Sequence, residues 1–405
     1  MNGLAQLAAE LGDSVTGSDR SYTPGGASFS WLEELGVAFS PQDGSGITLQ
    51  TGRVVYSTAI EADNADLVAA RTLGIPLYHR ADFLKELIGN DEVIAVAGTA
   101  GKTTTTGLLG WIFECLGKDP TVYNGAGVLN WKEASRPGNV RMGNSGLWII
   151  EADESDKSFL TFHPSHSVIT NISKDHFELD QLHNMFDQFE SQTAGLTIRG
   201  SSGAFAELEV NVPMMGRHNL DNARCAAKLC LDLGMSREAV FEAIGRFEGI
   251  ERRLEIAGNT HGITIIDDYA HNPAKIGAAL RAVSETYACV HAFWRPHGFT
   301  PLAQGMDGLV EAFSSHWQAF GGTIHILPVY YAGGTVERKT TSEELVERLN
   351  SAGIPASYVP DYDVLQDELE ARAQPGDAIL GMGARDPELP LFARKLVKEW
   401  KKSRS

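Results

Sequence analysis

The sequence predicts an α/β protein with parallel sheets, divided into two or three domains. Its 405 residues exceed what a single ordinary core accommodates. Amphipathic helical patterns alternate with short apolar strand patterns along the whole chain, which is typical of parallel sheets joined by helices. This alternation restarts twice, so we expect domains at residues 1–88, 89–247 and 248–405.

The first range has helical and strand patterns in turn. Helical patterns cover residues 4–12, 30–37, 65–74 and 81–89, and strand patterns cover 14–19, 53–60 and 75–80. A doubly wound domain normally opens with a strand and a glycine-rich turn, whereas this sequence opens directly with a helical pattern. We therefore expect a truncated domain whose first strand is missing.

The second range opens with an apolar strand, a glycine-rich loop at 98–104 and a helix. Glycines let the backbone wrap a phosphate group, Lys102 adds positive charge, and the Thr103 hydroxyl can bind magnesium. Val96 stands where the stricter motif has its first glycine, so this loop is a shorter variant. The alternative is a glycine-rich turn with an exposed lysine.

Two polar segments follow later strands of this range. Carboxylates of the run 151–156 stand at the end of an apolar strand, where they can hold the magnesium that bridges ATP oxygens. The alternative is a solvated acidic turn. The segment 170–176 ends in His176, which is a candidate metal ligand or proton carrier, or otherwise a surface histidine.

A third polar segment stands at the start of a later helix. Asn219 or Asn222 could recognise an adenine edge, although Asn219 or Asp221 could equally cap the helix.

The last range begins with polar residues as well. Arg252 and Arg253 suit a phosphate clamp, or form a surface ion-pair turn. The run 267–273 holds acid, tyrosine, histidine and asparagine side chains, too many for a simple turn, and Pro273 suits the first turn of a helix.

Charge and cysteine content restrict the partners and the compartment. The formal net charge of -18 repels nucleic acid and anionic membrane, so we predict neither as a partner. The four cysteines form no C-x-x-C pair and their spacing suits no zinc site, which favours a reducing compartment. No signal peptide and no apolar run of about 20 residues is present, so we predict a cytoplasmic protein.

Six motifs, taken together and in this order, resemble those of the Mur ligase family. They are GTAGKTTTT, EADESDKSFL, TNISKDH, GRHNLDNA, GIERRLE and DDYAHNP. The resemblance implies three domains: a truncated Rossmann-like N-terminal domain that binds a UDP-sugar, a central P-loop domain that binds ATP, and a Rossmann-like C-terminal domain.

The resemblance also implies roles for individual residues. Catalytic roles fall to Lys102, Glu151, His176 and Arg253, and magnesium ligands would be Thr103, Glu151 and His176. ATP would be bound by Gly98, Thr99, Gly101, Lys102, Thr103, Thr104, Asn219, Arg253, Asp268, His271 and Asn272. The UDP-sugar would be bound by Ser18, Asp19, Ser57 and Thr58.

The implied reaction is an ADP-forming amide ligation of peptidoglycan precursor synthesis, which joins L-alanine to UDP-N-acetylmuramate through an acyl phosphate. ATP and Mg²⁺ are the implied cofactors, the other partners are small molecules, and a monomer or homodimer is expected. Alternatives are a murein tripeptide ligase, another ligase of the family with a different acid substrate, and a non-catalytic nucleotide-binding relative.

Two further departures from the family pattern keep these alternatives open. The stretch between His176 and Gly216 is short, and Gly298 stands where the family has an arginine, in a segment linked to the amino acid.

Overall fold

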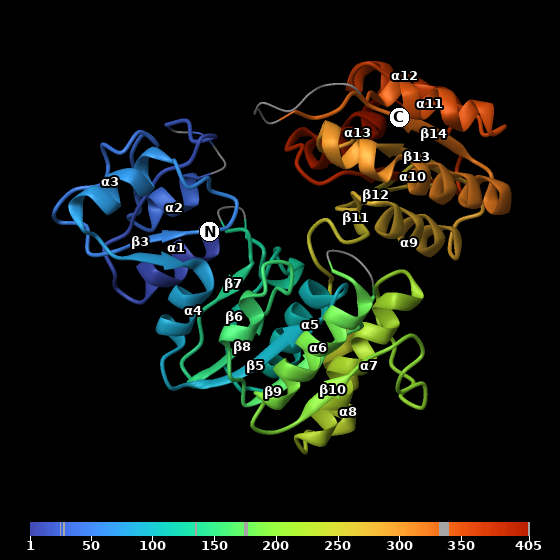
Figure 1. Ribbon diagram of the computed structural model, residues 1–405. Coiled ribbons are helices and arrows are strands. Elements are labelled where there is room, and N and C mark those ends of the chain that lie inside the picture. The colour runs from blue at the N-terminus through green and yellow to red at the C-terminus, as the bar shows by residue number, and fades with distance from the viewer. Residues whose placement is uncertain (25, 27–28, 134–135, 174–176, 332–339, 404–405) are drawn as a thin grey trace. The chain divides into compact units, whose positions relative to one another are not determined.

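The computed structural model describes residues 1–24, 26, 29–133, 136–173, 177–331 and 340–403 (Figure 1). The chain packs into two compact units. The first comprises Met1–Pro213 and His218–Ile250, and the second Met214–Arg217 and Glu251–Ser405. The three domain ranges expected from the sequence stay a prediction.

The N-terminal part of the first unit has short strands and four helices among its described residues. They are α1 (Asn2–Glu10), β1 (Thr16–Gly17), α2 (Ser30–Glu34), β2 (Ala38–Phe39), β3 (Val54–Tyr56), α3 (Ala65–Leu73), β4 (Leu77–His79) and α4 (Arg80–Ile88). Each predicted helix and strand is present, and β2 is an additional strand that interrupts the alternation. Strand β1 pairs only with β2 and β3 only with β4, so the described residues form two small parallel sheets rather than one.

Helices α1 and α4 bury their apolar sides in the same core as the strands that follow. Leu4, Leu7, Phe83 and Leu84 belong to one buried cluster with Trp148 of the larger sheet. Because burial of apolar side chains drives this packing, the N-terminal helices join the first unit.

The larger sheet of the first unit has six strands. In chain order the elements are β5 (Glu92–Ala97), α5 (Lys102–Cys115), β6 (Thr121–Tyr123), β7 (Val140–Arg141), β8 (Leu147–Glu151), β9 (His166–Ile169), α6 (Leu179–Ser191), β10 (Thr197–Arg199), α7 (Arg217–Asp232) and α8 (Arg237–Gly245). The strand order is β10-β9-β5-β8-β6-β7, and only β7 is antiparallel to its neighbour.

Strand β5 lies between β8 and β9, and its last five residues are buried. Such burial is expected of a parallel strand covered on both faces. Because neighbouring parallel strands end at the same edge, the segments after β5, β8 and β9 are brought together there.

The second unit is built around another six-stranded sheet. Its elements are β11 (Glu255–Thr260), β12 (Ile263–Asp268), α9 (Pro273–Ser284), β13 (Val290–Trp294), α10 (Phe299–Phe320), β14 (Thr323–Ile326), α11 (Ser342–Ser351), β15 (Ala356–Tyr358), α12 (Tyr362–Arg372), β16 (Ala378–Met382) and α13 (Glu388–Ser403). The order is β11-β12-β16-β13-β14-β15, with β11 antiparallel to β12 and the others parallel.

Two separate apolar clusters cover the faces of this sheet. One draws on α9, α10 and α11, and the other on α12 and α13. The last strand in sequence, β16, lies in the middle, where Ala378 is in register with both Thr264 and Val290.

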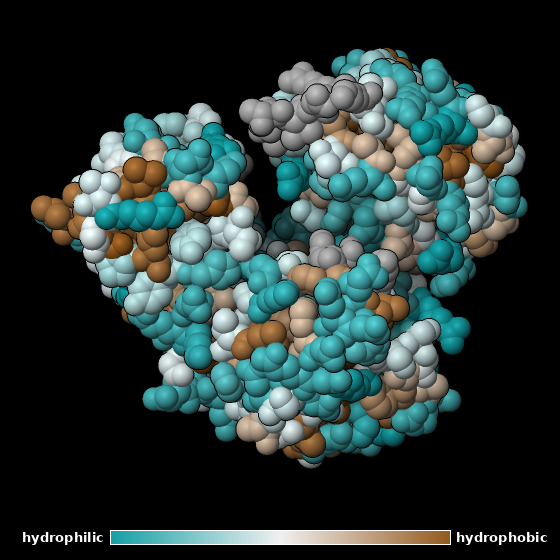
Figure 2. Space-filling view, viewed as in Figure 1, coloured by the Kyte–Doolittle hydropathy of each residue, from teal (hydrophilic) through white to brown (hydrophobic). Residues whose placement is uncertain are grey.

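On the face seen in Figure 2, hydrophilic residues predominate on both units, and several hydrophobic residues gather over the N-terminal part of the chain. Among the described residues, no helix combines the length and the apolar character needed to cross a bilayer.

Candidate active site

Two glycines give the loop after β5 its shape. Gly98 has φ +128° and Gly101 has φ +85°, values that favour glycine. A Cβ at Gly98 would collide with the Thr170 hydroxyl, and one at Gly101 with the Asn222 amide oxygen. Gly101 is the N-cap of α5 and has no side chain to occupy the first N–H groups of that helix, so they suit an anion.

Asn171, which follows β9, fastens this loop. Its Oδ1 accepts a hydrogen bond from Ala100 N at 3.2 Å and its Nδ2 donates to Ala100 O at 2.6 Å. Its backbone oxygen accepts from Thr99 N at 3.0 Å, and Thr99 Oγ1 donates to Ser173 O at 3.0 Å. Asn171 was not among the residues predicted to have a role, although a polar residue directly after a buried strand was a usable signal.

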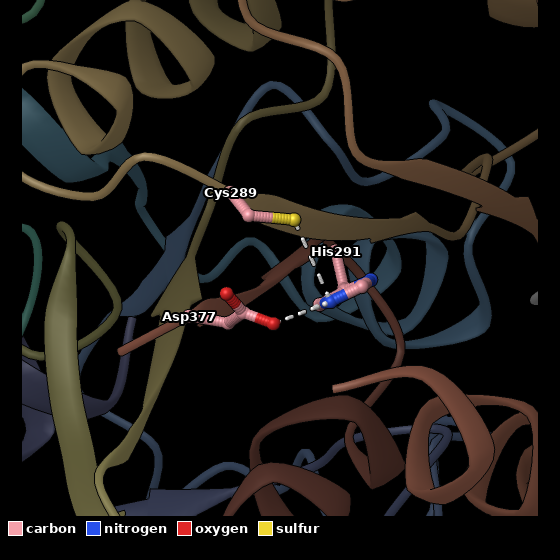
Figure 3. Close-up of side chains that lie close together, drawn as sticks. All are labelled: Cys289, His291 and Asp377. Atoms are coloured by element: carbon pink, nitrogen blue, oxygen red, sulfur yellow. Dashed lines mark hydrogen bonds and ion pairs between the residues drawn. The ribbon is translucent and has the colours of Figure 1, made fainter. Parts of the chain in front are cut away.

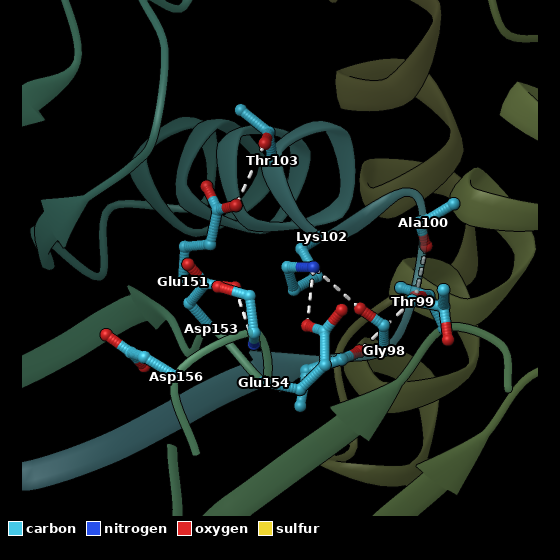
Figure 4. Close-up of polar contacts among 12 residues, drawn as sticks. Gly98, Thr99, Ala100, Lys102, Thr103, Glu151, Asp153, Glu154 and Asp156 are labelled. Carbon is cyan, nitrogen blue, oxygen red and sulfur yellow. Dashed lines mark hydrogen bonds and ion pairs between the residues drawn. The ribbon is translucent and has the colours of Figure 1, made fainter. Parts of the chain in front are cut away.

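Lys102 folds back over the loop. Its Nζ donates to Gly98 O at 2.8 Å and forms an ion pair with Glu154 Oε2 at 2.6 Å (Figure 4). The side chains are 12% and 3% exposed. Burial raises the pKa of Glu154, and Lys102 opposes that rise. The lysine charge is thus held inside the loop by a carboxylate that an incoming phosphate would join or replace.

Thr103 and Glu151 form a second polar pair, beside the first. Thr103 Oγ1 donates to Glu151 Oε1 at 3.0 Å, and Glu151 Oε2 accepts from Gly125 N at 2.7 Å. A hydroxyl and a carboxylate this close provide the oxygen ligands that Mg²⁺ prefers, so these two residues fit the ion. Glu154 pairs with Lys102 instead, and His176 lies outside the described residues.

An arginine from the N-terminal part holds the acidic loop. Arg80, the first residue of α4, donates to Asp153 Oδ2 at 3.1 Å and to Asp156 Oδ2 at 3.0 Å. Burial would raise the pKa of Asp156, but hydrogen bonds from Ser158 and Arg80 outweigh burial and lower it. A small pocket lies here, lined by Arg80, Ala81, Leu84, Tyr123, Glu151, Asp153, Ser158 and Phe162. Sequence reasoning missed Arg80, because more than 70 residues separate it from its partners.

Helix α7 presents the two asparagines that were candidates for adenine recognition. Both are buried, and Asn222 Nδ2 donates to Asn219 Oδ1 at 3.4 Å. The Asn222 amide also lies against Gly101 of the glycine-rich loop after β5. A role of Asn219 in ATP binding stays a prediction.

Four candidate residues lie in the second unit, around the end of β12. The Arg253 guanidinium lies 5.3 Å from the centre of the Tyr269 ring. Asp268 accepts from Leu254 N at 2.8 Å and from Ala270 N at 2.7 Å, and thereby fixes the turn.

The remaining two stand at the start of the next helix. Asn272 caps α9 by accepting from Lys275 N at 2.9 Å, and Pro273 occupies the first turn as predicted. Burial lowers the pKa of His271 to about 4, so its imidazole is neutral at pH 7.

Buried ion pairs support this edge of the second sheet, and we call them the C-terminal frame: Arg252 with Asp267, and Arg295 with Asp386 and Tyr362. Arg252 Nε lies 3.1 Å from Asp267 Oδ2, and Arg295 Nη1 lies 2.8 Å from Asp386 Oδ2. The Tyr362 hydroxyl donates to Asp386 as well. Both aspartate side chains are 2% exposed, and burial raises the pKa of Asp267 to about 6.

The four candidate UDP-sugar residues follow β1 and β3. Ser18 donates to Asp66 of α3, and Asp19 Oδ1 accepts from Ser21 N at 2.8 Å. Ser57 and Thr58 come directly after β3, in the other small sheet. Their role in binding stays a prediction.

Comparison with known proteins gives consistent matches. The family model described as "Mur ligase family, catalytic domain" matches residues 1–91, and "Mur ligase, glutamate ligase domain" matches residues 252–385. A UDP-N-acetylmuramate–L-alanine ligase of Rhizobium meliloti is 31% identical, covering 95% of this chain and 91% of the relative. One of Sinorhizobium fredii is 32% identical, covering 98% and 94%.

Solved structures have the same fold. The UDP-N-acetylmuramate-alanine ligase MurC of Thermotoga maritima has a TM-score of 0.81 at 24% identity, covering 100% of this chain and 97% of that one. A murein peptide ligase of Psychrobacter arcticus has a TM-score of 0.65 at 21% identity, covering 99% and 96%. The predicted α/β, three-domain Mur ligase fold class is confirmed.

Proposed function

Since the chain belongs to the Mur ligase family, we propose that it is an ATP-dependent ligase of peptidoglycan precursor synthesis that joins L-alanine to UDP-N-acetylmuramate. The proposal extends to formation of ADP, a requirement for Mg²⁺ and a cytoplasmic location. The names of the curated relatives, which align with almost the whole chain, support the choice of substrates.

One observation carries the proposal: the phosphate loop places Lys102 beside Glu154, and Thr103 beside Glu151, at one edge of one sheet. Phosphoryl transfer is helped by cations and metal-binding oxygens placed around the phosphate groups, and these residues supply both types of group. The first turn of α5 and Lys102 would neutralise phosphate charge.

Thr103 and Glu151 would hold the magnesium ion, which, when bound, draws negative charge from the phosphate oxygens. Arg80 would keep the acidic loop in place by its bonds to Asp153 and Asp156. Asn171 would keep the phosphate loop in shape through both ends of its side-chain amide.

The chemistry follows from the weakness of a carboxylate as an electrophile. The carboxylate of the sugar nucleotide takes the terminal phosphoryl group of ATP, and ADP leaves. The amine of alanine then attacks the acyl phosphate carbon, the C–O bond to phosphate breaks, and the amine loses a proton. Each amide bond formed therefore yields one ADP and one phosphate. Ser18, Asp19, Ser57 and Thr58 are proposed to hold the UDP-sugar, and Asn219, Arg253, Asp268, His271 and Asn272 the nucleotide.

The test is phosphate release from ATP and magnesium with UDP-N-acetylmuramate and each amino acid in turn. We expect release only when both the sugar nucleotide and L-alanine are present. Lys102→Ala is expected to lower the rate by roughly 100- to 1,000-fold, because it removes a cation placed at the phosphate groups. Lys118→Ala, which removes an exposed lysine after the same helix, is the matched control.

Other outcomes would change the assignment. Release with a peptide in place of L-alanine would favour a murein tripeptide ligase. Release with a different acid would indicate another substrate, and no release with any pair, despite ATP binding, would indicate a non-catalytic relative.

A further inference from the structure

Three ligand-type side chains converge at the amino end of the second sheet, at the edge opposite the candidate site residues of that unit. They are Cys289, which precedes β13, His291 of β13 and Asp377, which precedes β16 (Figure 3). The sulfur, ring nitrogen and carboxylate oxygen that they offer all lie within 4.8 Å of one another. We propose that this cluster is a transition-metal site of the zinc type.

The contacts converge on a single atom. His291 Nε2 lies 3.8 Å from Cys289 Sγ and 3.1 Å from Asp377 Oδ2. A ring nitrogen carries at most one proton, so one linear hydrogen bond cannot serve both neighbours. A cation between the three atoms satisfies all of them, and tetrahedral zinc at its usual bond lengths of about 2.0–2.3 Å separates its ligand atoms by roughly 3.3–3.5 Å.

The backbone holds the three residues in register. Ala378 N donates to Cys289 O at 3.0 Å, which places Asp377 beside the cysteine. Asp377 Oδ2 also accepts from Gln374 N at 2.7 Å, which orients the carboxylate. The His291 side chain is 5% exposed, so its ring cannot swing out into solvent. Little rearrangement is therefore needed to bind an ion.

A chain of hydrogen bonds supports the far side of the histidine ring. His291 Nδ1 lies 2.9 Å from Thr323 Oγ1, which lies 3.0 Å from His325 Nε2, and His325 Nδ1 lies 2.8 Å from Ser357 Oγ. With a metal on Nε2, His291 Nδ1 carries the proton and donates to Thr323, as metal-bound histidines do to their outer partners. Without metal, His291 Nε2 carries the proton and donates to Asp377, and donor and acceptor are exchanged in each hydrogen bond of the chain. Both states thus leave its members bonded.

The ligand types select the metal. Thiolate and imidazole suit zinc and cobalt, whereas Mg²⁺ prefers oxygen ligands, so this site is chemically distinct from the one proposed at Thr103 and Glu151. Binding forms a sulfur–metal bond, displaces water from the ion and releases the thiol proton to solvent. The fourth position is left for water.

The position of the cluster indicates its role. His291 lies near the start of β13 and Arg295 directly follows its end, four residues or roughly 13 Å away, so the metal would not reach the carboxyl edge. It would instead link β13 to β16 and, through Thr323, to β14. We therefore expect it to stabilise the second unit.

The test is titration of the chelator-treated 405-residue protein with Co²⁺, in excess Mg²⁺ and without nucleotide. We expect a thiolate-to-cobalt charge-transfer band that saturates at one equivalent and is lost when Zn²⁺ is added. Cys289→Ser should abolish the band, whereas Cys115→Ser, which alters another partly exposed cysteine, should retain it. Asp377→Asn should weaken cobalt binding by at least about tenfold.

Three results would overturn the proposal. The first is the absence of the band in the unaltered protein, and the second is a band of undiminished strength in Cys289→Ser. The third is unaltered affinity in Asp377→Asn, since the carboxylate would then not be a ligand. A higher thermal unfolding midpoint with Zn²⁺, lost in Cys289→Ser, is the expected companion result, and no rise at saturating metal would contradict the stabilising role.

Discussion

The two six-stranded sheets use their carboxyl edges in different ways. The first sheet places there a lysine whose partners are a backbone oxygen and one carboxylate, and a threonine paired with another carboxylate. The second places there arginines that each bond several groups of their own unit: Arg252 contacts Asp267 and the backbone oxygens of Gly383 and Ala384.

At the first edge the charged side chains have few partners, which a ligand can replace. At the second edge each arginine has several partners within its own unit, which keep the edge in one conformation. In the proposed function, a phosphate oxygen would take the place of one carboxylate on Lys102. Displacing the frame of the second sheet would instead leave several buried polar groups unpaired, at a cost of about 1–3 kcal/mol each. Substitutions in the frame should therefore mainly change stability, and substitutions around the phosphate loop should mainly change ligand binding.

The largest expected effect is that of Asp386→Ala, in the frame. It leaves Arg295 and Tyr362 without their shared carboxylate, and breaking a buried pair costs roughly 3–5 kcal/mol. Urea unfolding followed by hydrogen exchange in β13 and β16 would measure it.

The control for this substitution is Asp363→Ala. It removes a side chain that is 89% exposed and pairs with Lys395 at 3.4 Å, and is expected to cost less than about 1 kcal/mol. Equal stability of the two variants would show that the frame does not hold the edge.

A smaller effect concerns pH. His316 of α10 is buried, and burial lowers its pKa from 6.5 to about 4. Between these two pH values the unfolded chain binds a proton at this histidine, whereas the folded state does not. The contribution of neutral His316 to the free energy of unfolding is therefore fully present above pH 6.5 and is lost as pH falls toward 4. It amounts to roughly 2 kcal/mol between pH 7.5 and pH 5.

His316→Gln should reduce this loss of stability on acidification, measured as urea midpoints of the second unit at both pH values. His183→Gln removes an exposed imidazole from α6 of the first unit, so it should leave the pH dependence of the second unit unchanged. An unaltered pH dependence in His316→Gln would contradict the assignment.

The smallest expected effect is that of Arg80→Ala, which releases the loop of Asp153 and Asp156. We expect the Mg²⁺ concentration for half-maximal phosphate release to rise by about tenfold, because partners that orient metal-binding segments affect affinity by about 10- to 100-fold. Arg53→Ala, which removes an ion pair to Glu86 of the same helix, is the control. The same magnesium requirement in both variants would refute the positioning role.

Local patterns predicted the features that short stretches of chain determine. The apolar run, glycine-rich loop and helix around Lys102 were found in that order, as was Pro273 in the first turn of α9. In each case the physical cause lies within a few residues: burial of a strand, φ values that favour glycine, or a proline ring whose fixed φ suits the first turn of a helix.

Features that depend on distant pairing could not be predicted in this way. The bonds of Asn171 to Ala100 span 71 residues and that of His291 to Asp377 spans 86, and nothing local to either partner records the other. The spacing of the cysteines indicated no zinc site, because only one of the three proposed ligands is a cysteine and Asp377 is distant from the other two in sequence. The two small N-terminal sheets were likewise unforeseen, since strand patterns do not state which strands pair.

The place of β16 has a consequence for how the protein is made. In the first sheet, the early strand β5 is central, and β8 and β9 can join it as soon as they are synthesised. In the second sheet, β12 and β13 stay apart until residues 378–382 have left the ribosome, because β16 separates them. A nascent or prematurely terminated chain therefore carries unpaired strand edges that invite aggregation, and the second sheet becomes complete only after residues 378–382 have been synthesised.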